Sequence, residues 1–442
     1  MLPPEILSVV CSCVPKPALK NLRQVCKAYE QAATPYLFDE IFLSFNATDL
    51  RIAKLFVIRF KQYIRKLTFS SNYYEDLDES DFIEAYQNYD GMGDDPDAEA
   101  TLATYAFRLH CETRKMQKET LQSGTCPAYL SFVLANTPNL QKIVLTDKLS
   151  SRSMSLSSLE DHLPWPLKTC PEEGCDLFFE HLGCSRDSGF ARKGIDNPWR
   201  TILLGLIATN STVKELTMEP QECELPTNSA AFKLSPPELR DTKLCFGALT
   251  KLHLSLAIEN MKYTSNGESY FVHRNVAKLL RAARNLRCLS VLPVVEHSAV
   301  EYPSIRAVLG RCEFPSLTSL ILVFFNSSEA DLRRILKRSR KLEQLTIQGH
   351  TLTSGSWALL ANWAKTSLPL KSVSFNQLYG GFEEPWEDIE YTDYFGDVES
   401  FFNKQGINPF DAQNLRRNEA TPTSRQVTGA KDSYLERISM FH

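Results

Sequence analysis

The sequence predicts an α/β protein, with a short helical cluster at the amino terminus followed by an irregular solenoid that has parallel strands inside and helices outside. Apolar residues recur at helical spacing over about the first 35 residues, which predicts the cluster. A six-residue apolar phrase then recurs eight times along the chain, and amphipathic stretches precede several of its later copies. Strands that alternate with helices in this way stack into a repeat array around one continuous core.

The composition is that of an ordinary globular protein. Apolar residues make up 43% and charged residues 23% of the 442 residues, which is enough apolar material for a continuous core. Lys and Arg number 49 and Asp and Glu number 53, so the formal charge is −4 and we expect no nucleic acid as a partner. The twelve cysteines are too few for a disulfide scaffold, which favours reduced thiols.

The amino-terminal segment and the apolar stretches indicate where in the cell we expect the protein. The segment Met1 to Glu5 has neither the basic nor the apolar region of a secretory signal. Apolar stretches such as residues 202–208 fall far short of the roughly 20 residues that a membrane helix needs. We therefore expect no membrane partner and a location in the cytoplasm, the nucleus or both.

Three short helices are expected at the amino terminus. The first follows Pro3 or Pro4, either of which is tolerated in a first helical turn, and carries Ile6, Val9, Val10 and Cys13 at helical spacing. A break at residues 14–17 separates it from further helices, which are expected to stop at Pro35. So few residues bury too little surface to fold alone, so the cluster needs a partner or the following domain.

The residues of this cluster resemble an F-box, in the version common among fungal proteins, over roughly the first 45 residues. The resemblance rests on Leu2-Pro3-Pro4-Glu5-Ile6-Leu7, Val14-Pro15, Leu19, Leu22-Arg23-Gln24-Val25-Cys26-Lys27, Tyr29 and Ala33-Thr34-Pro35-Tyr36-Leu37-Phe38. It implies that the cluster docks on the Skp-type adaptor and cullin of an SCF-like ubiquitin ligase, while the rest of the chain recruits a protein substrate. The adaptor-binding residues that it implies are Leu2, Pro3, Pro4, Ile6, Leu7, Val10, Leu22 and Val25.

The recurring phrase has the pattern apolar-x-x-apolar-x-apolar, which is typical of a short strand. It occurs at Ile64–Phe69, Leu140–Leu145, Val213–Met218, Leu249–Leu254, Leu286–Val291, Leu317–Leu322, Leu342–Ile347 and Leu370–Phe375. Successive copies start 76, 73, 36, 37, 31, 25 and 28 residues apart. The later spacings approach the 20–29 residues of a leucine-rich repeat, so residues 46–380 resemble such a domain.

The consensus of that repeat is nearly met only in the seventh phrase, where His350 stands at the position that usually holds Asn. Amphipathic helices are expected before the later phrases, with apolar faces at Val276, Leu279 and Leu280, then Leu332, Ile335 and Leu336, then Trp357, Leu359, Leu360 and Trp363. Side chains that flank the central strand residue should face the concave surface. They are Glu215, Thr217, Lys251, His253, Ser319, Ile321, Gln344, Thr346, Ser372 and Ser374, of which Lys251, His253, Gln344, Thr346, Ser372 and Ser374 are the candidate substrate-binding residues.

Two long gaps between the first phrases are either insertions or hidden repeats, near residues 71–125 and 150–197. The first holds an acidic loop followed by a long helical stretch from about Ala98 to Leu121. Residues 381–442 form a carboxyl-terminal extension whose tail, from about residue 414, is expected to be poorly ordered.

No motif for catalysis is recognised, so we expect neither an enzyme nor a cofactor. Four side chains of the type that binds zinc lie close together, namely Cys170, Cys175, His181 and Cys184. Their spacing is unusual, and buried cysteines are the favoured interpretation, so no metal is expected. The basic segment from Arg333 to Lys341 is interpreted as the solvated face of a helix.

The leading hypothesis is therefore a substrate-recognition adaptor of a cullin–RING ligase. The alternative is a repeat scaffold that binds proteins without ubiquitin transfer. The two differ in whether the apolar face of residues 2–38 is open to an adaptor or closed by the chain's own repeats.

Overall fold

The computed structural model describes residues 2–70, 78–80, 96–146, 198–219, 227–258, 268–295, 302–310 and 312–380, together with residues 398, 401, 402, 408 and 410. The chain divides into two compact units, Met1–Leu225 and Pro226–His442. Among the described helices none is long and apolar enough to cross a membrane.

The first unit begins with three helices, α1 (Pro4–Ser12), α2 (Lys16–Leu22) and α3 (Lys27–Leu37). They enclose a small core of Cys11, Leu19 and Ala33. Pro4 stands in the first turn of α1 as the sequence predicts, because the nitrogen there needs no hydrogen. The prediction that Pro35 stops the third helix is wrong, since α3 continues to Leu37. A proline this close to a helix end removes only one backbone hydrogen bond, which the last turn tolerates.

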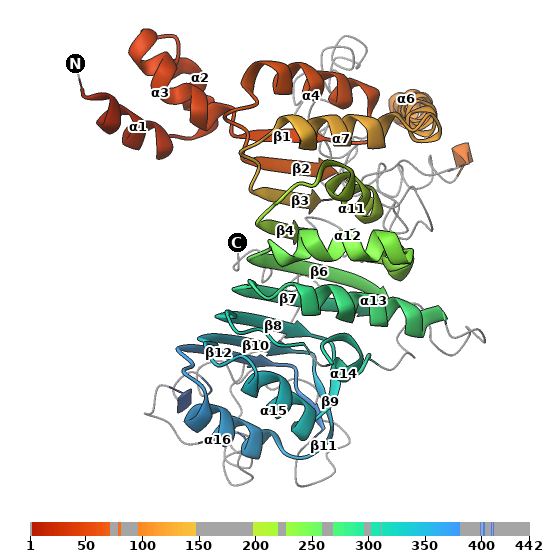
Figure 1. The fold of residues 1–442 in the computed structure, drawn as a ribbon. Coiled ribbons are helices and arrows are strands. Elements are labelled where there is room, and N and C mark those ends of the chain that lie inside the picture. Colours follow the sequence, from red (N-terminus) through yellow and green to blue (C-terminus); the bar gives the residue numbers. More distant parts are fainter. Residues whose placement is uncertain are drawn as a thin grey trace. The chain divides into compact units, whose positions relative to one another are not determined.

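Four parallel strands follow in the first unit, in the order β1-β2-β3-β4. They are β1 (Glu40–Leu43), β2 (Lys66–Ser70), β3 (Lys142–Thr146) and β4 (Glu215–Met218). The helices α4 (Ala47–Phe60), α7 (Thr125–Asn136) and α11 (Pro198–Thr209) lie along one face of these strands, and α6 (Pro96–Gln122) precedes α7 (Figure 1). The long helical stretch expected near Ala98–Leu121 is thus confirmed as α6.

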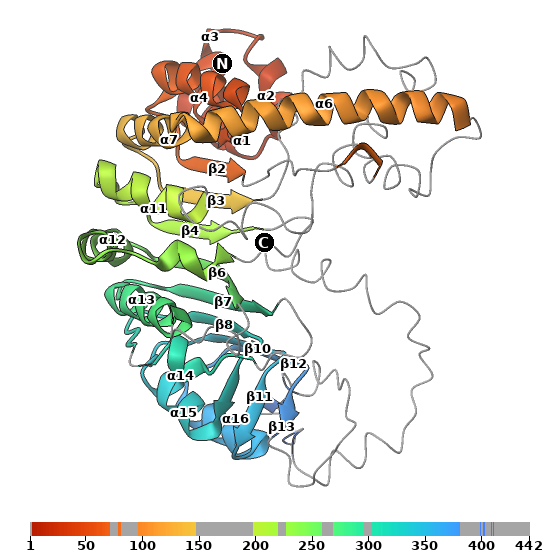
Figure 2. The same ribbon diagram turned by 90° about the vertical axis from the view of Figure 1, so that its right-hand side faces the viewer.

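The second unit contains five parallel strands in the order β6-β7-β8-β10-β12, with the short β5 (Thr227–Asn228) beside β6. They are β6 (Lys251–Ile258), β7 (Cys288–Val295), β8 (Ser319–Val323), β10 (Gln344–Gln348) and β12 (Ser372–Asn376). The connecting elements are η2 (Ser229–Phe232), α12 (Pro236–Gly247), α13 (Glu268–Ala282), α14 (Ile305–Val308), α15 (Glu329–Lys337) and α16 (Trp357–Ser367). The longer helices cover one face of the strands, as the second view shows (Figure 2).

A second, three-stranded parallel sheet lies in the same unit, in the order β13-β11-β9. Its strands are β9 (Asn326–Ser328), β11 (Thr351–Ser354) and β13 (Tyr379–Gly380). Each follows a main strand after one residue of positive φ, namely Phe324, Gly349 and Gln377, and one buried residue. The sequence pattern does not reveal this sheet, because its strands are two to four residues long.

All eight apolar phrases form strands, and each strand begins two residues after the first apolar residue of its phrase. That first residue is buried in seven of the phrases, as Leu342 and Leu317 illustrate, and Leu370 of the eighth phrase is half-buried. The two long gaps are insertions between neighbouring strands, since β2 pairs directly with β3, and β3 with β4. The strand β1 has no matching phrase and was not predicted.

The apolar faces of the later helices are confirmed except at Leu359, and Trp363 is half-buried. Leu332, Ile335 and Leu336 are buried in α15, and Trp357 and Leu360 in α16. Leu359, however, is 57% exposed, so its assignment to the inward face is wrong. Its neighbour Leu360 occupies that face instead, one helical step of 100° away. In the carboxyl-terminal extension, Phe402 and Phe410 pack against Phe375 of β12.

Candidate partner-binding surfaces

Five large apolar side chains of the amino-terminal helices are exposed, and we call them the open apolar surface. They are Leu2, Ile6, Val9, Val10 and Val25, with exposed fractions of 51%, 48%, 61%, 43% and 65%. Four belong to α1 or the residues just before it, and Val25 lies in the turn between α2 and α3. An exposed cluster of this kind marks a binding surface more often than it marks a free surface.

The inner face of the cluster holds these side chains in place. Leu7 and Cys11 of α1 are buried one helical turn apart, so Ile6, Val9 and Val10 point away from the core. The hydroxyls of Ser8 and Tyr36 form a 2.8 Å hydrogen bond that fixes α1 on α3. The exposed apolar residues therefore stand on a helix whose other face is already satisfied.

The predicted adaptor-binding residues differ in exposure. Leu7 is 3% exposed, and Leu22 is half-buried against the core of the cluster. Leu7 therefore faces the interior of the cluster, and adaptor binding by the set stays a prediction. Pro3 and Pro4 are exposed beside Leu2, and Val9, absent from the predicted set, is 61% exposed.

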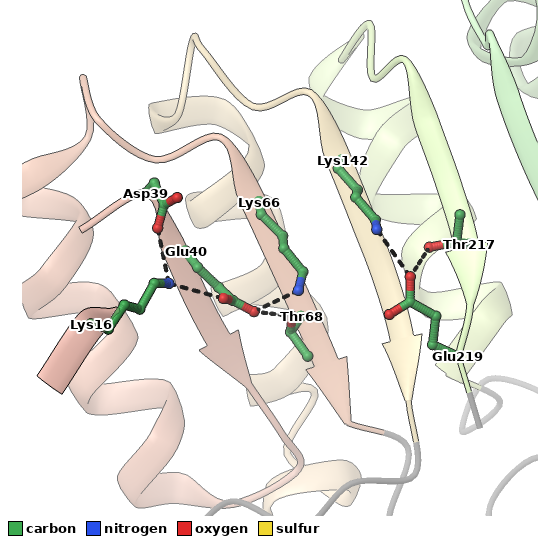
Figure 3. A network of polar contacts seen from close by, with 8 residues as sticks. All are labelled: Lys16, Asp39, Glu40, Lys66, Thr68, Lys142, Thr217 and Glu219. Carbon is green, nitrogen blue, oxygen red and sulfur yellow. Dashed lines mark hydrogen bonds and ion pairs between the residues drawn. The ribbon is translucent and has the colours of Figure 1, made fainter. Parts of the chain in front are cut away.

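A polar network joins the helical cluster to the first two strands (Figure 3). The Lys16 ammonium of α2 lies 2.9 Å from a carboxylate oxygen of Asp39 and 3.0 Å from Glu40 of β1. Glu40 also pairs with Lys66 at 2.9 Å and accepts a 2.7 Å hydrogen bond from the Thr68 hydroxyl. Burial opposes ionisation of Glu40, but the Thr68 hydroxyl and the two ammonium groups outweigh it and lower its pKa to about 2.

Aromatic contacts reinforce this junction. Phe38, directly after α3, stacks on Phe60 of α4 with a ring separation of 3.8 Å, and Arg23 lies over the Phe38 ring at 4.9 Å. The cluster is thereby anchored to α4 as well as to β1.

Three side chains on the strand face of the first unit bind one another. Lys142 of β3 pairs with Glu219 at 3.0 Å, and the Thr217 hydroxyl donates to the same carboxylate at 3.2 Å (Figure 3). Strand alternation places Thr217 on this face, but Thr217 is only 1% exposed and leaves no surface for a partner. Lys142, Thr217 and Glu219 are therefore already engaged with one another.

Ten side chains on the opposite side of the strands from the helices form what we call the open strand face of the second unit. One row is Lys251, Cys288, Ser319, Gln344 and Ser372, and the next is His253, Ser290, Ile321, Thr346 and Ser374, each aligned by the parallel register. The residues between the rows, such as Leu252 and Leu345, are 1% exposed and face the helices. Gln344 and Ser372 are exposed and the other eight are half-buried.

All six predicted substrate-binding residues therefore lie on one face of the second unit. Cys288 and Ser290 of β7 belong to the same rows and were missed, although the phrase at Leu286–Val291 is the signal that locates them. The structure shows only where these residues lie, so binding by them stays a prediction.

The basic segment of α15 has internal partners. Arg333 pairs with Glu329, donates a 2.9 Å hydrogen bond to the Leu359 carbonyl, and lies 5.7 Å from the Trp363 ring centre. Arg334 pairs with Asp331 at 3.2 Å. These contacts agree with the interpretation of the segment as the outer face of a packed helix.

The cysteine and histidine motif at Cys170, Cys175, His181 and Cys184 lies outside the described residues. Within the described ranges no group of three or more His, Cys, Asp or Glu side chains could hold a metal ion. Among the described cysteines Cys126 is buried, and burial raises its pKa to about 12.

Comparison with known proteins gives little. No protein-family model and no curated protein matches the chain. Among solved structures, the chain is similar to the crystal structure of a Rad7 and Elc1 complex in yeast, with 12% sequence identity, coverage of 85% of this chain and 69% of that chain, and a TM-score of 0.35. A likeness at this level says nothing about activity or partners.

Proposed function

We propose that the protein is the substrate-recognition adaptor subunit of a cullin–RING ubiquitin ligase of the SCF type. In this proposal the helical cluster is an F-box that docks on the Skp-type adaptor, and the strand–helix repeats bind the protein target without catalysing a reaction themselves. The observation that carries the proposal is the open apolar surface of Leu2, Ile6, Val9, Val10 and Val25, on residues that resemble an F-box.

The exposure of these residues favours the proposal over a closed repeat scaffold. Helices that merely capped the solenoid would turn their apolar faces toward it, whereas the structure leaves five large side chains in water. Burial of each such side chain against a partner contributes roughly 1.5–3 kcal/mol. The sum over several side chains must exceed the entropy that the two proteins lose on association.

The test is association with the Skp-type adaptor. Purified full-length protein is titrated with the adaptor by calorimetry, and Ile6→Asp is compared with the wild type. A carboxylate buried opposite an apolar partner is strongly unfavourable, so Ile6→Asp should weaken binding at least tenfold.

Ile58→Asp is the matched control, because Ile58 is 60% exposed on α4 of the same unit. It should leave adaptor affinity unchanged. Far-UV circular dichroism and the melting temperature should be the same for both variants. Absence of adaptor binding by the wild type, or equal loss in both variants, would refute the proposal.

A further inference from the structure

The open strand face of the second unit differs from the strand face of the first unit in how its polar groups are satisfied. Lys66 and Lys142 of the first unit pair with Glu40 and Glu219. Lys251, on β6 of the second unit, forms no ion pair with any residue in the described ranges. Six neutral side chains of this face likewise make no side-chain hydrogen bond to another described residue: Ser290, Ser319, Gln344, Thr346, Ser372 and Ser374.

The chemistry of these groups is unevenly divided between donors and acceptors. Lys251 has three N–H donors and no acceptor, Gln344 has two donors, and each hydroxyl can donate one hydrogen bond. None of the ten residues of the face is a carboxylate, and its two ionisable nitrogen groups, Lys251 and His253, both become positive when protonated. The face therefore complements a ligand rich in negatively charged acceptor atoms.

The dimensions of the face fit an extended polypeptide. Five strands at a spacing of about 4.8 Å span roughly 19 Å, which about six extended residues cross at some 3.3 Å per residue. A segment of that length running across β6, β7, β8, β10 and β12 would meet both rows of hydrogen-bonding side chains.

We infer that the open strand face of the second unit binds an acidic polypeptide segment, with Lys251 meeting an anionic side chain and the hydroxyls and Gln344 donating hydrogen bonds. The inference rests on the proposed function in treating that segment as part of the target protein. The shared chemistry is a row of anionic oxygen atoms, which Asp and Glu side chains or phosphoserine can supply.

The experiment selects binders from a random library of displayed 12-residue peptides against the full-length protein. Peptides retained by the wild type should be enriched in Asp and Glu. The enrichment should fall in Lys251→Glu, because the added carboxylate repels the same groups.

A control of equal charge change is Lys337→Glu, at the carboxyl end of α15, where Lys337 is exposed and outside the strand face. This variant should retain the acidic peptides. A retained peptide made synthetically should bind the wild type and Lys337→Glu with similar affinity by fluorescence anisotropy. Its affinity for Lys251→Glu should be at least tenfold lower.

Two further arms identify the anion and its specificity. The same peptide with phosphoserine in place of its acidic residues shows which source of negative charge binds more tightly. Inorganic polyphosphate that binds wild type, Lys251→Glu and Lys337→Glu equally would indicate attraction elsewhere on the molecule. Retained peptides without acidic enrichment, or acidic peptides that bind all three proteins alike, would overturn the inference.

Adaptor affinity is measured on the same preparations. Acidic-peptide binding without adaptor binding would refute the proposed function and leave this inference standing. Adaptor binding without acidic-peptide selection would refute this inference and leave the proposed function standing.

Discussion

At the scale of single residues, His350 has the most unusual environment. It stands where the repeat consensus has Asn, directly before β11, and it is fully buried. Its Nε2 atom lies 2.7 Å from the Ser327 hydroxyl, and its ring meets Trp357 edge-on at 5.7 Å. Its Nδ1 atom has no hydrogen-bond partner among the residues that the structure describes. Burial lowers the pKa of His350 to about 3 from an ordinary value of 6.5.

This pKa predicts a pH-dependent stability. Between pH 6.5 and about 3 the unfolded state binds a proton at His350 and the folded state does not, so stability falls as the pH falls through this window. At pH 5 the loss relative to pH 7 should be about 2 kcal/mol. Urea unfolding at the two pH values should show this difference in the wild type and a smaller one in His350→Asn. Equal differences in the two proteins would mean that the pKa of His350 is the same in the folded and unfolded states.

The alternation along β10 makes a second prediction at this scale. Leu345 is 1% exposed and faces the helices, whereas its neighbour Thr346 lies half-buried on the open strand face. Leu345→Ala should cost about 2–5 kcal/mol through the cavity it leaves. Thr346→Ala should cost almost nothing. Urea denaturation of both variants checks this, and similar costs would contradict the assigned register.

At the scale of elements, the turn between β10 and β11 depends on a glycine. Gly349 has φ +57°, and a Cβ atom built there would lie 2.2 Å from the Phe324 ring. The backbone of Phe324 is itself in the left-handed region. Gly349→Ala therefore combines an unfavourable backbone conformation with a clash against a ring that stacks on Tyr302.

Gly124, directly before α7, separates the two effects. It has φ +66°, but a Cβ atom there would meet nothing within 4 Å. Gly124→Ala should cost about 1–2 kcal/mol, which is the backbone contribution alone. Gly349→Ala should cost clearly more in the same thermal unfolding assay. Equal costs would show that the Phe324 ring moves aside freely.

Elements that bury several apolar residues at a fixed spacing were predictable from the sequence. Elements with too few buried residues to form such a pattern were not. The phrase Leu342–Ile347 locates β10 because Leu342, Leu345 and Ile347 must all be buried, and the same reasoning locates the other seven phrase strands. The strand β1 escapes because its two buried residues, Ile41 and Leu43, are too few to form a phrase. The sequence also does not predict which face of α1 is buried. Ile6 and Leu7 are equally apolar, and only packing decides which of them turns inward.

The candidate surfaces show the same limit. Rows of the open strand face follow from strand alternation, so Lys251, Gln344 and Ser372 were found from the sequence. Whether a polar side chain on a strand is free or paired depends on residues distant in sequence. Lys142 illustrates this, because its ion-pair partner Glu219 lies 77 residues further along the chain, a separation that no local pattern encodes.

At the scale of the whole molecule, the two candidate surfaces belong to separate compact units. A ligand that binds one folded unit stabilises that unit against local opening and has no direct contact with the other. The proposed adaptor and the inferred acidic segment should therefore protect different parts of the chain.

Amide hydrogen exchange of the full-length protein tests this separation. The Skp-type adaptor should slow exchange in α1 and in the turn around Val25, and leave β6–β12 unchanged. A selected acidic peptide should slow exchange in β6, β7, β8, β10 and β12 and leave α1 unchanged. With both ligands present the protection should be the sum of the two patterns, because sites without shared contacts act additively. Protection of α1 by the peptide would instead show that the two surfaces are coupled, or that the peptide occupies the open apolar surface.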